Sequence, residues 1–398
     1  MELLTGSVRH YSWGSRELIA TLRGEAVPTQ RPEAEVWFGA HPAGSALIGE
    51  QPLVDIIAAD PESQLGADVR ARFGDRLPFL LKLLAAAEPL SLQAHPSLEQ
   101  AREGFAREDA EGIAIGADQR NYKDDNHKPE LIVALTEFEA MAGFRPLAKT
   151  LELLHLLNCA ELERYLSMLG GEGSREEDDL RALFTTWITI PTMAREQLIS
   201  EILVAINAAL SRKLEPWQTE ALENIVQLHE RYPFDVGVLG ALLLNKFTLQ
   251  PGEAIFLDAG QLHAYVNGLG VEIMANSDNV LRGGLTPKHV DVPELVRILK
   301  FSSLESPQVE ADKVAGWSRY ATPVDEFQLR SATNTESFLV DAHGPAILLV
   351  VAGKVEAKCG DATVVLSPGD AAWIAAQDPE VTATPLGGQA TVFLAEVG

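Results

Sequence analysis

The sequence predicts a mainly β protein with an α-helical insertion. Short apolar runs with Gly and Pro between them fill much of the chain before residue 146, and short strand-like runs return from about Thr322 to the end. Between these parts, Leu and Ile recur at three- and four-residue spacing from Pro146 to Tyr232, which is typical of helices. With 398 residues and 46% hydrophobic composition, the chain can bury a large core divided into two or three domains.

The first part is expected to contain strands and one helix. The ranges Glu33 to Ile48 and Leu77 to His95 combine apolar runs with turn residues and indicate sheet segments. Ser97 is followed three residues later by Gln100, which is a capping-box pattern and predicts a helix over Ser97 to Glu108.

The helical insertion is expected over residues 146–231. Leu147, Leu151, Leu154 and Leu157 would share one face of a helix, because side chains three and four residues apart lie on the same side. After Pro233 strand-like segments return. The part from about residue 322 is almost wholly β, so a sandwich or barrel of jelly-roll type is expected there.

Two similar turns indicate two related barrels. Gln250-Pro-Gly-Glu253 and Ser367-Pro-Gly-Asp370 each precede an apolar strand, although such turns also arise independently in β proteins. His263 follows the first proline by twelve positions, whereas the same offset in the second copy gives Glu380. We therefore expect two cupin-type jelly-roll barrels plus a helical domain: residues 1–145 with 232–321 as the catalytic barrel with the metal site, 146–231 as the helical insertion, and 322–398 as a barrel without metal.

The composition predicts a soluble, cytoplasmic protein that binds neither nucleic acid nor a membrane. Lys and Arg number 32 against 57 Asp and Glu, and this formal charge of -25 repels polyanions. A small phosphorylated ligand is still compatible, since a pocket needs only a few cations. Cys159 and Cys359 provide no disulfide framework, residues 1–14 do not resemble a secretory signal, and the apolar runs are too short to span a membrane. The oligomeric state stays open, with a monomer as the simplest expectation.

Several polar residues have the chemistry of metal ligands. Gln93 and His95 are two residues apart in an expected strand, so their side chains and that of Ser91 face the same side. Further along, His127 and Glu130 lie on either side of Lys128-Pro129, where proline favours an extended chain, and His263 adds another imidazole. Each histidine taken singly is more often a structural residue.

Five motifs, in this order, resemble those of the type I phosphomannose isomerases of the cupin superfamily. They are Leu77-Pro-Phe-Leu-Leu-Lys82, Pro89-Leu-Ser-Leu-Gln-Ala-His-Pro96, His127-Lys-Pro-Glu130, Gln261-Leu-His-Ala-Tyr265, and the stretch from Glu272 to Lys288 that contains Asn-Val-Leu-Arg-Gly-Gly-Leu-Thr. Tyr11-Ser-Trp-Gly14 and the stretch from Ala34 to Pro42 are similar to that family as well. The resemblance implies a mannose-6-phosphate isomerase, a zinc-dependent aldose-ketose isomerase that forms fructose 6-phosphate through an enediol.

The resemblance also implies that one Zn2+ per chain is held by Gln93, His95, Glu130 and His263. Oxygen and imidazole ligands without thiolate suit a Lewis-acid zinc that keeps room for substrate or water, with Mn2+, Fe2+ and Co2+ as alternatives. His127 is the rival ligand. We expect it in the substrate pocket or behind the ligands instead.

The resemblance implies a catalytic role for Arg282, whose guanidinium stays charged and would stabilise the developing oxyanion. Glu272 and Lys128 are the two candidates for the base, and the residues alone leave this choice open. The expected substrate contacts are Ser91, Lys82, His127, Lys288 and Trp13, with Lys128 as a further cation and Trp37 as a second aromatic at the sugar face.

Two other functions are compatible with parts of the sequence. A catalytically silent cupin that binds or senses a sugar phosphate would not need Arg282, so the presence of this arginine among the metal-ligand motifs favours the enzyme. A metal-dependent oxygenase would favour more histidines around a redox metal, and Gln93 does not suit it.

Overall fold

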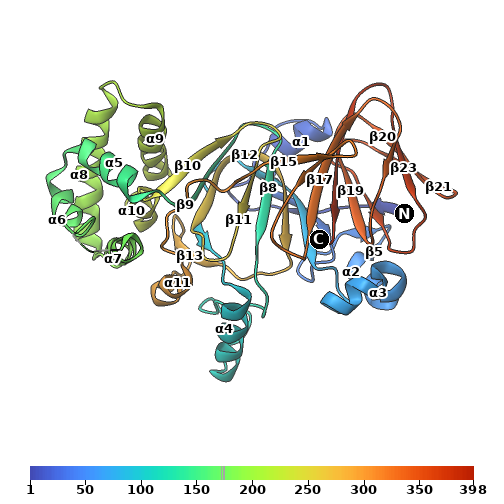
Figure 1. Cartoon of the computed structure of the whole chain (residues 1–398), viewed down its shortest axis with the longest axis horizontal. Helices are drawn as coiled ribbons and strands as arrows, with labels where there is room; N and C mark the ends of the chain where they lie inside the picture. The colour runs from blue at the N-terminus through green and yellow to red at the C-terminus, as the bar shows by residue number, and fades with distance from the viewer. Residues whose placement is uncertain (172, 174) are drawn as a thin grey trace.

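The protein is mainly β-sheet with helices, as a computed structural model of residues 1–171, 173 and 175–398 shows. The helices α5 to α9 lie at one end of the elongated molecule, strands β20, β21 and β23 lie at the other, and a large sheet lies between them (Figure 1). Among the described residues, no helix is long and apolar enough to cross a membrane.

The central sheet has eleven strands and carries the candidate site. Its main path runs β14-β11-β8-β12-β6-β3-β2, and β7, β9, β10 and β13 pair beside this path. The strands are β2 (Ser7–Arg9), β3 (Glu35–Gly39), β6 (Phe79–Ala86), β7 (Leu92–Ala94), β8 (Glu130–Ala134), β9 (Phe138–Phe144), β10 (Leu244–Leu249), β11 (Ala254–Leu257), β12 (His263–Ala275), β13 (Leu281–Gly284) and β14 (Gln308–Val309).

Strand β12 connects the two halves of this sheet. Its first half pairs with β7 and β9, and its second half pairs with β6 and β8. The division falls at Gly268, where φ is 123° and a Cβ would lie 2.7 Å from the Glu137 carbonyl oxygen. Only glycine fits such a position without strain, so β12 changes its pairing partners at a residue that has to be glycine. One strand thereby carries both His263 and Glu272.

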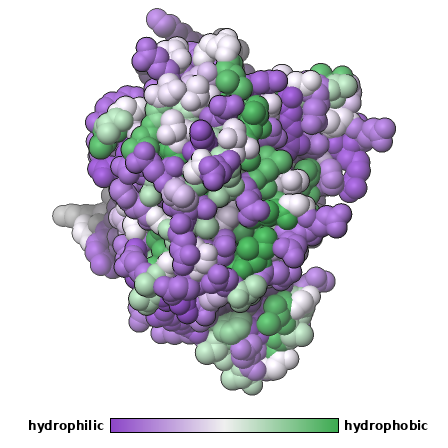
Figure 2. Space-filling model, turned by 90° about the vertical axis from the view of Figure 1, so that its right-hand side faces the viewer, coloured by the Kyte–Doolittle hydropathy of each residue, from purple (hydrophilic) through white to green (hydrophobic). Residues whose placement is uncertain are grey.

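The C-terminal part consists of two further sheets. A seven-stranded sheet has the order β1-β22-β19-β24-β17-β16-β15, and a four-stranded sheet has the order β18-β23-β20-β21. Their strands are β1 (Glu2–Leu4), β15 (Ala311–Val314), β16 (Trp317–Tyr320), β17 (Gln328–Asn334), β18 (Phe338–Val340), β19 (Ala346–Ala352), β20 (Val355–Cys359), β21 (Ala362–Leu366), β22 (Ala371–Ile374), β23 (Val381–Pro385) and β24 (Ala390–Glu396). The face of the molecule at this end is mostly hydrophilic, with a band of hydrophobic side chains (Figure 2).

The C-terminal sheet takes strands from both sides of the predicted boundary at residue 322. β15 and β16 precede that boundary; β15 pairs with β16, and β16 pairs with β17. β1, from the start of the chain, pairs with β22. One buried apolar cluster also joins the two large sheets, since Phe38 and Val271 belong to the same cluster as Ile347, Trp373 and Phe393. The two β parts therefore share a core.

The helices expected between 146 and 231 are present. They are α5 (Leu147–Leu157), the 3-10 turn η1 (Ala160–Leu162), α6 (Glu163–Leu166), α7 (Glu176–Ile188), α8 (Thr192–Leu210) and α9 (Pro216–Arg231). Leu154 and Leu157 are buried on α5, while Leu147 and Leu151 pack at the margin of the same core. The helix expected after Ser97 is confirmed as α4 (Leu98–Ala110), with both hydrogen bonds of the capping box formed.

Several short helices were missed from the sequence. They are α1 (Leu18–Arg23), α2 (Leu53–Ala59), α3 (Pro61–Phe73), α10 (Val236–Ala241) and α11 (Val292–Ile298), while β4 (Leu47–Ile48) and β5 (Gln51–Pro52) form a small hairpin. Strands return after Pro233 with β10, but α10 comes before them. Nearly all residues of α10 are apolar and buried in the same core as the helical insertion. The helix therefore lacks the alternation of apolar and polar faces by which a helix is recognised in a sequence.

Candidate metal centre and adjoining pocket

Three potential metal ligands converge inside the central sheet. His95 follows β7, Glu130 begins β8 and His263 begins β12, and their ligand atoms all lie within 4.8 Å of one another. The Glu130 Oε2 atom is 3.5 Å from His95 Nε2 and 3.3 Å from His263 Nε2. All three side chains are buried. The sheet therefore holds one carboxylate between two imidazoles.

Backbone carbonyls orient both imidazoles. His95 Nδ1 donates to the Asn279 oxygen at 2.8 Å, and His263 Nδ1 donates to the Gln261 oxygen at 2.9 Å. Each ring then presents the lone pair of Nε2 to the centre, as a metal-binding histidine does. The two Nε2 atoms and Glu130 Oε2 are buried without a hydrogen-bond partner among the described residues. Because buried polar atoms are rarely left unpaired, this donor set fits a divalent metal ion.

The surrounding charges keep these groups in their metal-binding forms. Burial and the neighbouring Lys128 lower the pKa of His95 to about 4, so the ring is neutral near pH 7. Burial by itself raises the pKa of Glu130, but Lys128 and the two histidines outweigh it and hold the pKa well below its usual range. The centre therefore has the neutral imidazole of His95 beside the Glu130 carboxylate.

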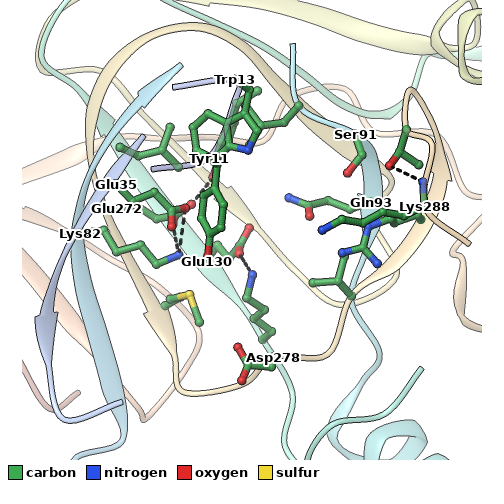
Figure 3. A pocket seen from close by; sticks show the side chains of 18 of the residues that line it. Tyr11, Trp13, Glu35, Lys82, Ser91, Gln93, Glu130, Glu272, Asp278 and Lys288 are labelled. Carbon is green, nitrogen blue, oxygen red and sulfur yellow. Dashed lines mark hydrogen bonds and ion pairs between the residues drawn. The ribbon is translucent and has the colours of Figure 1, made fainter. Parts of the chain in front are cut away.

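Gln93 lies next to the three convergent side chains. Its backbone pairs with His263 of β12 on one side and with Arg282 of β13 on the other. Its side chain lines the same cavity as Glu130 (Figure 3), and among the described residues its amide makes no hydrogen bond. The amide oxygen is thus free to be a fourth ligand.

A cavity of about 450 Å³ adjoins this centre. On one side, the buried ammonium of Lys82 lies 2.8 Å from Glu272 Oε2 and 3.8 Å from Glu35 Oε1 (Figure 3). Tyr265 donates its hydroxyl to Glu272 Oε1 at 2.9 Å. Burial raises the pKa of Glu272 although Lys82 opposes the change. A carboxylate with a raised pKa and fixed geometry therefore faces the cavity.

Two cations without carboxylate partners lie on the opposite side. Arg282 and Lys288 line the cavity together with Ser91 and make no side-chain ion pair within the described part of the chain (Figure 3). Burial lowers the pKa of Arg282, and burial together with Arg282 lowers that of Lys288. Unpaired neighbouring cations are unusual in so acidic a protein, and they make this side suitable for an anionic group.

Three other residues named from the sequence also line the cavity. Lys128 is bonded to Glu130 Oε1 at 2.6 Å, so this carboxylate joins the metal centre to the pocket through its two oxygens. Trp13 stacks on Tyr11 with ring centroids 5.7 Å apart, and Trp37 donates its indole N–H to Glu35 at 2.7 Å. The aromatic rings thus form one wall.

His127 is not among the residues that line this cavity. Its Nε2 atom lies 2.5 Å from a Glu326 carboxylate oxygen, in the turn before β17. The lining gives no support to a substrate-pocket position, and a position of His127 behind the metal ligands stays a prediction. In the extended segment His127 to Glu130, adjacent side chains point in opposite directions, and Lys128 is the one that faces the cavity.

Several residues of the pocket were missed from the sequence. Tyr11, Glu35, Tyr265 and Asp278 all line it. Tyr265 follows His263 by two positions and shares its strand face, so the period of two was a usable signal. Glu35 approaches Lys82 only because β3 pairs with β6, and that register was not visible in the sequence.

Comparisons with known proteins identify the family that the chain resembles. A family model described as phosphomannose isomerase type I, catalytic domain, matches residues 1–147. The mannose-6-phosphate isomerase of Salmonella typhimurium is 40% identical over 404 residues, with 99% of each chain covered. The enzyme of Homo sapiens is 33% identical over 386 residues, with 89% of this chain and 88% of the human protein covered.

Solved structures give the same result. A crystal structure of mannose 6-phosphate isomerase bound with zinc and yttrium superposes with a TM-score of 0.88 at 38% identity, and all of both chains is covered. The apo form from Salmonella typhimurium superposes with a TM-score of 0.88 at 39% identity, with 100% of this chain and 99% of that chain covered.

Proposed function

The chain belongs to the type I phosphomannose isomerase family, and we propose that it interconverts mannose 6-phosphate and fructose 6-phosphate with one bound zinc ion. The observation that carries the zinc assignment is the set of buried, unpartnered atoms His95 Nε2, Glu130 Oε2 and His263 Nε2, which face one another. Gln93 would supply the fourth ligand from the neighbouring strand. When bound, zinc supplies Lewis-acid stabilisation of substrate oxygens.

The unpaired cations support the binding of a sugar phosphate. Lys288 and Ser91 would bind the phosphate, while Arg282 lines the same cavity and pairs through its backbone with Gln93. Arg282 would neutralise the oxyanion that develops during proton transfer, because its charge has no other partner among the described residues. The wall of Tyr11 and Trp13 would exclude water from the sugar.

The reaction moves a proton between C1 and C2 through an enediol, and we assign the base to Glu272. Two features support it: burial raises the pKa of Glu272, which suits proton transfer near neutral pH, and Lys82 and Tyr265 hold both of its oxygens. Lys128 is the alternative. Its ammonium is paired with Glu130, which favours a role as a proton donor or fixed cation.

A catalytically silent sugar-phosphate sensor is the second candidate. It is disfavoured because Arg282, Glu272 and the metal centre face one cavity, an arrangement that binding alone does not require. We further propose that both β parts are cupin-type jelly rolls, with the helical insertion at 146–231 and the metal centre in the first of them.

Metal removal tests the proposed function. We expect the purified protein to form fructose 6-phosphate from mannose 6-phosphate, to lose this activity when a chelator removes the metal, and to regain it with Zn2+. The measurement is a coupled spectrophotometric assay together with metal content per chain. A protein that is loaded with zinc and shows no turnover would contradict the enzyme assignment and favour the sensor.

Substrate affinity is expected to weaken with rising pH. Burial and Arg282 lower the pKa of Lys288, so its ammonium is present at neutral pH and is lost earlier than usual as the solution becomes alkaline. A neutral amine binds a phosphate dianion poorly, and KM should therefore rise through that range while kcat changes less. In Lys288→Met, KM should be high already at neutral pH and lose this dependence. An unchanged KM profile in the variant would remove Lys288 from phosphate binding.

A further inference from the structure

Asn279 lies in the loop between β12 and β13 and is fully buried. Its side-chain oxygen accepts from the backbone N–H of Lys123 at 2.7 Å, and its amide nitrogen donates to the carbonyl oxygens of Asp124 and Asn126, each at 2.8 Å. The same oxygen also accepts from the Asp124 backbone N–H at 3.3 Å, so one amide side chain binds four backbone groups of the segment that leads into β8. A buried amide with this many partners is held in a single orientation.

The segments joined in this way carry the reactive residues. The segment Lys123 to Asn126 leads directly to Lys128 and Glu130, while the Asn279 loop leads directly to Arg282. Asn279 therefore ties the carboxylate ligand of the metal centre to the strand that carries the unpaired arginine.

Asp124 completes the same connection from the other side. Its carboxylate accepts from the Ser277 hydroxyl at 2.8 Å, from the Asp278 backbone N–H at 2.7 Å and from the Asn279 amide at 3.2 Å. Burial raises the pKa of this carboxyl, and no cation pairs with it among the described residues. Its charge is balanced by neutral donors, and only the Asn126 backbone N–H at 3.0 Å, which lies in the same segment, would remain if the two loops separated.

The backbone of Asn279 contacts a metal ligand directly. Its carbonyl oxygen accepts the hydrogen bond from His95 Nδ1 at 2.8 Å, which fixes the tautomer and the direction of this imidazole. We propose that Asn279 is a positioning residue: its side chain locks the two loops together so that its own carbonyl orients His95, with Glu130 and Arg282 held in register. This inference deepens the proposed function and rests on the metal centre assigned there.

Zinc affinity of the Asn279→Asp variant tests the proposal. The change keeps the shape of the side chain but places a carboxylate oxygen against the carbonyls of Asp124 and Asn126, so the loops should separate. We expect zinc to bind about 10- to 100-fold more weakly, as measured by competition with a chromogenic chelator. At saturating zinc, kcat should fall while KM changes less, because the phosphate contacts are intact.

Asn276→Asp provides the matched control. Asn276 lies in the same loop and donates its side-chain amide to the Leu77 oxygen at 2.6 Å. Only its backbone carbonyl, which the substitution leaves in place, contacts residues 123–126, by accepting from the Asn126 amide at 3.0 Å. This variant introduces the same charge and should lower the thermal midpoint of the metal-free protein by a similar amount, yet bind zinc as the unmodified chain does. Equal zinc affinities for both variants and the unmodified chain would overturn the proposal.

Ser277→Ala decides the matter if Asn279→Asp does not fold. It removes only the hydroxyl that donates to Asp124 and accepts from the Asn279 N–H at 3.2 Å. We expect about two- to tenfold weaker zinc binding, and unchanged binding would overturn the proposal. The unmodified chain distinguishes failure of the proposed metal centre from failure of the proposed role of Asn279. If the unmodified chain did not bind zinc, the metal centre itself would be contradicted.

Discussion

Glu130→Gln is expected to lose its bound zinc and to lower the isomerase activity by about a thousandfold or more. The carboxylate is the only anionic group of the described cluster, and its Oε2 atom lies 3.5 Å and 3.3 Å from the two imidazole nitrogens. A neutral amide would coordinate a cation far more weakly. The change would also leave the buried Lys128 ammonium without its partner at 2.6 Å.

The effect on Glu130→Gln is measured as zinc per chain and as turnover with added zinc. Glu139→Gln is the matched control, since Glu139 is also a sheet carboxylate paired with a lysine, Lys246, but lies away from the cavity. The control should keep its zinc and its turnover. If Glu130→Gln retained one zinc per chain and the full rate, the assigned ligand set would be wrong.

Arg282→Ala is expected to keep its zinc and to lose about 100- to 1000-fold in kcat, the range found when a single oxyanion-stabilising group is removed. The guanidinium is half-buried, lines the cavity and has no carboxylate partner among the described residues. Its charge is therefore available to the substrate. Because alanine leaves the backbone pairing of Arg282 with Gln93 intact, the metal centre should be unaffected.

Two further variants separate charge from geometry at this position. Arg282→Lys should recover only part of the rate, since an ammonium lacks the planar fork of the guanidinium. Arg319→Ala, in which an exposed arginine paired with Asp312 in the C-terminal sheet is removed, should turn over normally. A kcat of Arg282→Ala equal to that of Arg319→Ala would remove Arg282 from the catalytic step.

The sequence predicted those parts of the site whose signals are local. The capping box predicted α4, and residues named from the motifs, such as Lys82, Gln93 and Arg282, line one cavity. The contacts that depend on strand register or on loops far apart in the chain were not predictable. Glu35 beside Lys82, Asn279 with Asp124, and His127 with Glu326 belong to this class.

The short helices escaped prediction for a related reason. α3 contains Gly66 in a non-helical conformation, and α2 is bounded by Pro52 and Asp60, so neither shows a sustained helical period. Their burial comes from packing on the sheets and is decided by tertiary structure. The local sequence therefore predicted the residue types of the candidate site better than it predicted the short helices between the strands.

The pairing of β1 with β22 sets an order for folding during synthesis. β1 leaves the ribosome long before β22, its partner in the sheet, and before β24. The edge of the seven-stranded sheet and the apolar cluster that it shares with the central sheet therefore stay open until these strands have emerged. The nascent chain keeps apolar surface exposed throughout that interval.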